Sequence, residues 1–175
     1  MSYYDEDFKL AEVISFLKNR DYSSFDFRRE YTANDALISI NDTDALLTIC
    51  NVPDNMIPEQ TVIQVIDVLE HLDECIEQAY EWLAFGEWGK EWYKEKVSNL
   101  DIVKKRYRVL EICFGLNDWP ESFHKICEEY CRGPEPQKGA DVFSIAFDHR
   151  DCDSGFNVKF LCADRRPYKY MIYVR

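Results

Sequence analysis

Long apolar runs are missing from this sequence. No stretch reaches the roughly 18–20 apolar residues that a helix needs to span a membrane, so we expect no transmembrane segment. The N-terminus carries acidic residues where a secretory signal peptide would carry lysine or arginine, and no apolar segment follows it directly. We therefore expect a cytoplasmic protein, with the polar residues 1–7 frayed from the fold.

A framework of paired cysteines is also missing. The chain has seven cysteines, an odd number, and no Cys-x-x-Cys pair. His124, Cys127 and Cys131 would share one face of a helix, but a structural zinc site needs four ligands. We expect reduced thiols that pack as small hydrophobic side chains, and we expect no metal or other cofactor.

Catalytic motifs are equally scarce. The sequence has no Gly-x-Ser-x-Gly elbow, no phosphate-binding loop, no dinucleotide fingerprint and no His-Glu-x-x-His helix. Its imidazoles are His71, His124 and His149, so few Cys–His pairs are available for nucleophilic catalysis. Catalytic residues can be scattered along a chain, which keeps an enzyme open, but these absences favour a protein without catalytic activity.

Basic residues are absent between Arg29 and Lys90. The acidic residues of this stretch are Glu30, Asp35, Asp42, Asp44, Asp54, Glu59, Asp67, Glu70, Asp73, Glu74, Glu77, Glu81 and Glu87. Downstream, residues such as Lys104, Arg106 and Arg165 roughly offset the acids around them. A protein with a net charge of −12 repels the phosphates of nucleic acids, so we expect no DNA or RNA partner.

The composition fits one globular domain spanning 1–175, because 46% hydrophobic residues suffice for one sizeable core. Apolar residues at helical spacing predict a first helix over 8–19. Two short apolar runs, 36–40 and 45–52, flank a polar turn and predict a hairpin.

Pro58 begins the strongest predicted element. A proline is tolerated in the first turn of a helix, where its missing N–H would have no helical partner. The residues that follow form one apolar stripe, namely Val62, Ile66, Leu69, Leu72, Ile76, Ala79, Tyr80 and Leu83. This stripe predicts one long amphipathic helix over 58–83.

The C-terminal part is predicted to consist mostly of strands. Segment 107–114 is rich in β-forming residues, and 142–147, 156–162 and 168–174 alternate apolar and polar positions. Short connections between the last three strands indicate an antiparallel meander. Segment 119–132 is ambiguous, and the spacing of its apolar residues favours a helix over a strand.

Together these elements predict an α+β fold. An antiparallel sheet, made of the N-terminal hairpin and the C-terminal meander, is expected to pack against the long amphipathic helix.

Five carboxylates of the long helix give it an acidic face. Asp67, Glu70, Glu74, Glu77 and Glu81 fall within a sector of about 80°, away from the apolar stripe. Like charges four residues apart repel, and no Lys or Arg of this helix offsets them. A solvated face that keeps the protein soluble is one interpretation. The other is a docking surface for a basic protein partner.

Aromatic residues follow this face. Trp82 and Trp88 lie next to the acidic positions, and they form either the closed edge of the core or an exposed anchor for the same partner. The partner-binding residues predicted from the sequence are therefore Asp67, Glu70, Glu74, Glu77, Glu81, Trp82 and Trp88.

The alternative function is a metal-dependent enzyme. Asp67, His71 and Glu74 would lie on neighbouring turns of one helix and combine two carboxylates with an imidazole. Segment 148–153 is dense in oxygen ligands as well, but it lacks the order of a calcium-binding loop, and its residues are typical of a hairpin turn.

In size, acidity, order of elements and lack of a catalytic motif, the chain resembles small bacterial proteins of unknown function. Some proteins of this kind are immunity proteins of polymorphic toxin systems, which bind and block a basic toxin such as a nuclease. The resemblance implies a protein that binds a basic partner, and it assigns no site residues.

Overall fold

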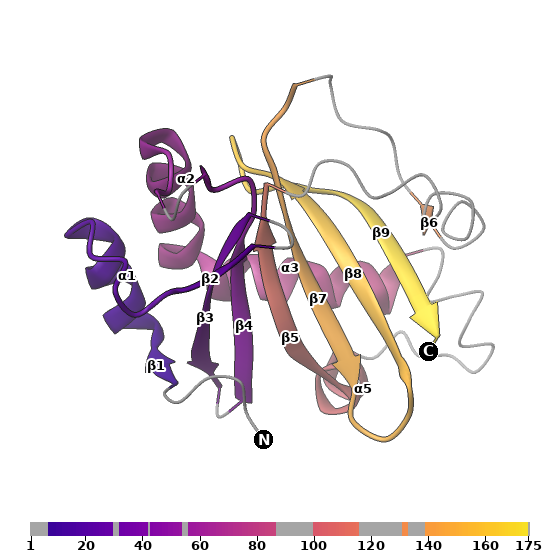
Figure 1. The fold of residues 1–175 in the computed structure, drawn as a ribbon. Coiled ribbons are helices and arrows are strands. Elements are labelled where there is room, and N and C mark those ends of the chain that lie inside the picture. The colour runs from indigo at the N-terminus through magenta and orange to yellow at the C-terminus, as the bar shows by residue number, and fades with distance from the viewer. Residues whose placement is uncertain are drawn as a thin grey trace.

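The strands form one mixed sheet, and the helices pack on one of its faces (Figure 1). The computed structural model describes residues 7–29, 32–41, 43–53, 56–86, 100–115, 131–132 and 139–174. The elements of these ranges are β1 (Phe8–Lys9), α1 (Leu10–Lys18), β2 (Asp26–Arg28), β3 (Ala33–Ile40), β4 (Thr43–Ile49), α2 (Glu59–Glu70), α3 (Leu72–Phe85), α5 (Leu100–Arg106), β5 (Tyr107–Phe114), β6 (Cys131–Arg132), β7 (Val142–His149), β8 (Ser154–Leu161) and β9 (Pro167–Val174). Helices and a mostly antiparallel sheet, as an α+β fold requires, are therefore confirmed.

The predicted antiparallel sheet is mixed at its centre. Its strand order is β1-β3-β4-β5-β7-β8-β9-β6, with β2 paired to β3. β4 and β5 run parallel, so that Leu47 faces Ile112 and Ile49 faces Phe114. Parallel neighbours need a crossover connection, and α2, α3 and α5 lie in the chain between these two strands. None of the helices in the described ranges combines the length and the apolarity needed to cross a membrane.

Stacked phenylalanines hold the C-terminal strands against the helices. Phe143 pairs with Phe160 and Phe147 with Phe156 across antiparallel strands, and the second pair stacks with ring centroids 4.4 Å apart. All four rings are fully buried. Tyr80 of α3 packs on Phe147 at 4.9 Å and donates a hydrogen bond to the carbonyl of Tyr107. These contacts place α3 across the centre of the sheet, behind β5, β7 and β8 in Figure 1.

The predicted long helix is two helices that run in different directions (Figure 1). The chain turns at His71, whose φ of −117° and ψ of 22° are not helical. The backbone N–H of His71 bonds to the carbonyl of Val68, three residues back, which leaves the carbonyl of Asp67 without its helical donor. The His71 ring replaces that donor, with Nδ1 2.8 Å from the Asp67 carbonyl oxygen. Because a carbonyl only accepts, this contact requires a proton on Nδ1.

The structure differs from two further expectations. The first helix begins at Leu10, because Phe8 and Lys9 form the short strand β1 beside β3. Cys131, expected at the end of a helix, lies in β6 and pairs with Met171 of β9. The rest of segment 119–132 and residues 1–6 lie outside the described ranges.

A buried carboxylate ties the edge strand β2 to the sheet. Asp35 of β3 is 0% exposed, and it forms an ion pair with Arg28 of β2. Removing the partner of a buried charge costs far more than removing an exposed pair, because the remaining charge stays desolvated. Arg28 therefore stabilises both the carboxylate and the pairing of β2 with β3.

We predict that Arg28→Met lowers the free energy of unfolding by about 3 kcal/mol. Lys18→Met is the matched control, because it breaks the exposed pair of Lys18 with Glu70 and should cost less than about 1 kcal/mol. Urea denaturation of both variants measures the difference. Equal losses in the two variants would show that Asp35 does not depend on Arg28.

Candidate functional site

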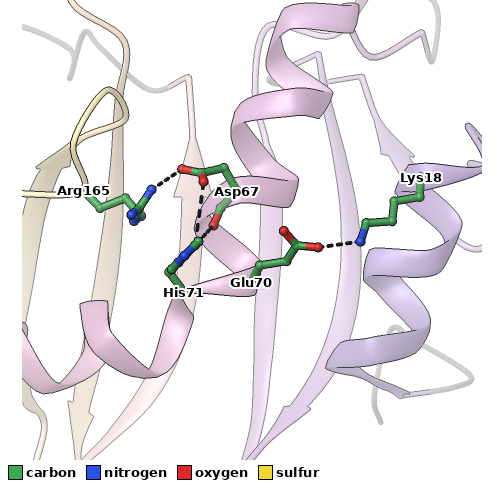
Figure 2. A network of polar contacts seen from close by, with 5 residues as sticks. All are labelled: Lys18, Asp67, Glu70, His71 and Arg165. Carbon is green, nitrogen blue, oxygen red and sulfur yellow. Dashed lines mark hydrogen bonds and ion pairs between the residues drawn. The ribbon is translucent and has the colours of Figure 1, made fainter.

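The break at His71 divides the predicted acidic face between two helices. Asp67 and Glu70 belong to α2, whereas Glu74, Glu77 and Glu81 belong to α3. Asp67 and Glu70 leave α2 in opposite directions, one towards the turn that follows β8 and the other towards α1 (Figure 2). The five carboxylates therefore do not form one continuous surface.

Three of the five carboxylates pair with basic residues of other elements. Figure 2 shows the pairs of Asp67 and Glu70. Asp67 Oδ2 lies 2.5 Å from Nη1 of Arg165, in the turn between β8 and β9. Glu70 Oε1 lies 2.5 Å from Nζ of Lys18 in α1. On α3, Glu77 Oε2 lies 2.6 Å from Nζ of Lys104 in α5. As expected, segment 58–83 itself contains no lysine or arginine. The basic partners come from other elements that pack beside it.

The carboxylates that stay open lie on α3. Glu74 and Glu81 are exposed, and neither forms an ion pair with any part of the chain that the structure describes. With Gln78 and Phe85 they occupy positions i, i+4, i+7 and i+11, which lie along one side of a helix. We call these four residues the α3 stripe. Its last member, Phe85, is 50% exposed, an uncommon state for a large apolar side chain.

Trp82 of α3 does not belong to the α3 stripe. It is half-buried, and its ring meets Tyr170 of β9 edge-on at 5.6 Å. This position is the closed edge of the core, one of the two interpretations of the tryptophans. Trp88 lies outside the described residues.

A groove with a volume of about 520 Å³ runs between α2, the segment before β7 and the end of β8. Gln60, Ile63, Gln64 and Asp67 form its helical wall, at the i, i+3, i+4 and i+7 positions of one face. The opposite wall comes from the residues just before β7 and at the end of β8, including Asp141, Leu161 and Cys162. Among the residues that line the groove there is no lysine or arginine.

Sequence reasoning found Asp67 but missed the groove. Its walls are 77 residues apart in the chain at the hydrogen bond from Gln64 to Asp141, so no local pattern joins them. The one local signal is Ile63, an apolar residue on the outward side of α2 that lies off the predicted stripe and is 51% exposed.

The described thiols are all free, which confirms that expectation for Cys50, Cys75, Cys113, Cys152 and Cys162. Burial raises the pKa of Cys75 to about 11. Burial, followed by the charges of Asp141 and Asp67, raises the pKa of Cys162 to about 12. Cys50 and Cys113 lie with their sulfur atoms 3.8 Å apart, and the hydrogen bond between them lowers the pKa of Cys50 and raises that of Cys113.

The two predicted metal sites are not assembled in the described ranges. No group of three His, Cys, Asp or Glu side chains in these ranges is arranged to hold a metal ion. His71 instead serves the end of α2, and Glu74 points to solvent. In the 148–153 segment, His149 Nδ1 accepts a hydrogen bond from the backbone of Asp151, as is typical of a turn.

The first prediction from this geometry concerns the ion pair of Asp67 with Arg165. Asp67→Asn should lower the free energy of unfolding by about 1 kcal/mol, because the Arg165 side chain is only 26% exposed and loses its partner. Glu81→Gln, the control, should leave it unchanged or raise it by about 0.3 kcal/mol by relieving repulsion from Glu77. Urea denaturation at low salt measures both. An unchanged Asp67→Asn would show that the pair adds nothing to stability.

The second prediction concerns thiol reactivity in the folded protein. The thiolate is the reactive form, and a pKa of about 11 leaves only about one Cys75 in a thousand ionised at pH 8. Alkylation followed by peptide mass mapping should therefore label the exposed Cys152 first, while Cys75 and Cys162 stay protected. Raising the pH increases the thiolate fraction, so Cys75 should become reactive before Cys162. Labelling of Cys162 as fast as Cys152 at pH 8 would contradict its burial.

These features, the α3 stripe and the groove beside α2, are the surfaces available for a functional assignment. Comparison with protein-family models, with curated proteins and with solved structures found no significant match for this chain. The function must therefore be argued from the geometry and the charge of these two surfaces.

Proposed function

We propose that this chain is a non-catalytic interaction protein that binds a basic protein partner. The α3 stripe is the observation that carries the proposal. It presents the carboxylates of Glu74 and Glu81 without an ion pair in the described ranges, and the ring of Phe85 at its end is half exposed. In contacts between proteins, aromatic side chains are enriched in the buried centre, and polar and charged side chains lie at the rim.

The distribution of ion pairs supports the choice of α3 over α2. Charges that already pair within the molecule must give up that pair before they attract a partner, whereas open carboxylates contribute directly to encounter. Asp67, Glu70 and Glu77 are paired, so they contribute less than the sequence pattern suggested. Asp73, in the first turn of α3 next to Glu74, is also exposed and forms no ion pair with the described residues.

The charge of the whole chain supports the sign of the partner. A net charge of −12 attracts basic surfaces over long distances and speeds their association. In size and acidity the chain resembles immunity proteins. If it acts as one, the partner is a basic toxin that the α3 surface covers.

Binding of fluorescein-labelled octalysine, followed by stopped-flow anisotropy, tests the proposal. The variant Asp73→Asn/Glu74→Gln/Glu81→Gln should weaken binding at least fivefold at low salt, mainly through slower association. Steering by charge is screened over a Debye length, so the loss should shrink as salt rises to 0.3 M.

The control removes the same charge elsewhere. Asp44→Asn/Asp151→Asn/Asp153→Asn changes three exposed carboxylates away from α3 and should weaken binding less than twofold. Non-specific attraction depends on net charge alone, so it would weaken both variants equally. Equal losses would therefore overturn α3 as the docking surface.

A further inference from the structure

The groove beside α2 has firmly held walls. Gln64 Nε2 donates a hydrogen bond of 2.7 Å to Asp141 Oδ2, which joins the helix to the segment before β7. Nη1 of Arg165, in the turn after β8, donates a hydrogen bond of 2.5 Å to Oδ2 of Asp67. The backbone N–H of Cys162 bonds to the carbonyl of Asp141 at 2.9 Å, which fixes the end of β8 against the same segment. A site with fixed walls loses little entropy when it binds a ligand.

The polar groups of the groove favour a positive charge. Its lining contains the carboxylates of Asp67 and Asp141 but no lysine or arginine. Asp67 is already engaged, because Arg165 bonds to its Oδ2 and Nδ1 of His71 lies 3.7 Å from its Oδ1. The bond from Gln64 goes to Oδ2 of Asp141 and leaves Oδ1 of Asp141 to other donors. Burial is the main cause of the raised pKa of Cys162, and the charges of Asp141 and then Asp67 add to it.

Apart from Gln60 and Gln64, the remaining residues that line the groove are apolar. Ile63 offers a half-exposed side chain on the helical wall, and Leu161 faces the same space from the end of β8. Ala140 and Ala163, whose side chains are small, also line the groove. An apolar floor next to carboxylates matches the two parts of a long basic side chain, an aliphatic stem and a charged head.

We propose that this groove binds a lysine or arginine side chain of the basic protein partner. The stem packs on Ile63 and Leu161, and the charged head donates a hydrogen bond to Oδ1 of Asp141. The inference rests on the proposed function, because it names where one residue of that partner lies.

Other ligand classes fit the groove less well. An anion would meet the carboxylate of Asp141, and an uncharged apolar group would desolvate that carboxylate without giving it a partner. A metal ion needs at least three converging ligands, and the described residues offer no such group. A volume of about 520 Å³ lies within the range of pockets that hold small ligands, so a long side chain and its flanking backbone can enter.

Titration of the ¹⁵N-labelled protein with capped amino acids tests the inference. The probes are the N-acetyl, N′-methylamide derivatives of lysine and arginine, with norleucine and citrulline as their neutral counterparts. The charged probes should shift the amide signals of Ile63, Asp141 and Cys162, and they should bind at least fivefold more tightly than the neutral ones. A larger response to arginine than to lysine would assign the planar head, and the reverse would assign the ammonium.

Two variants locate the binding. Asp141→Asn keeps an oxygen that can accept the bond from Gln64 but removes the charge, so it should weaken the charged probes at least fivefold. Ile63→Ser removes apolar surface and should weaken charged and neutral probes alike. Asp153→Asn, the control, should change neither. Equal binding of charged and neutral probes, or shifts confined to other regions, would overturn the groove as a site for a basic side chain.

This test is separate from that of the α3 surface. If the capped lysine binds in the groove, but the α3 variant and its control lose affinity for octalysine equally, the groove is retained and the α3 docking surface is overturned. If only the α3 variant binds octalysine more weakly, and the capped probes do not bind in the groove, the proposed function is retained and the inference fails.

Discussion

The parallel pairing of β4 with β5 is the constraint on which the rest of the structure depends. Antiparallel neighbours can be joined by a short turn, but parallel neighbours require the chain to cross one face of the sheet. The crossover here contains α2, α3 and α5, and it buries the phenylalanine rings of β7 and β8 beneath α3. It also carries the acid-rich part of the chain across a sheet whose neighbouring elements supply basic residues.

That route explains how a helical region without lysine or arginine is tolerated. α1 comes from the N-terminal side of the acid-rich stretch, whereas α5 and the turn after β8 come from its C-terminal side. Lys18, Lys104 and Arg165 reach the helices from these three directions. Exposed pairs of this kind are each worth little, but together they reduce the repulsion within the acidic region. Within the described residues, Glu74 and Glu81 of α3 form no ion pair, which is why the proposed function is placed there.

Local patterns predicted the elements, and long-range contacts decided how the elements meet. Strands at 107–114 and from Val142 onward follow from alternation and β-forming residues, which depend on neighbours in the sequence. The apolar stripe through 58–83 is continuous in sequence and does not reveal the break. Histidine is not a helix-breaking residue type, and the bond of the His71 ring to the Asp67 carbonyl becomes visible only in the structure. The basic partners of the acidic residues could not be predicted, since each lies 27 or more positions away.

The break at His71 also separates the two candidate surfaces. In a straight helix Asp67 and Glu74, seven residues apart, would lie along one side and compete for the same basic group. Because the chain turns, the side of α2 that carries Asp67 borders Asp141 and Leu161, which complete the groove. The open carboxylates of α3 lie on a helix that runs across the sheet. A partner that met both surfaces would have to present two separated basic groups. Binding at two such points gains affinity from the fixed geometry between them, because the second contact forms at a high effective concentration once the first is made. The turn at one histidine thus converts a uniform acidic face into two distinct surfaces, and that geometry favours selective recognition over general attraction of positive charge.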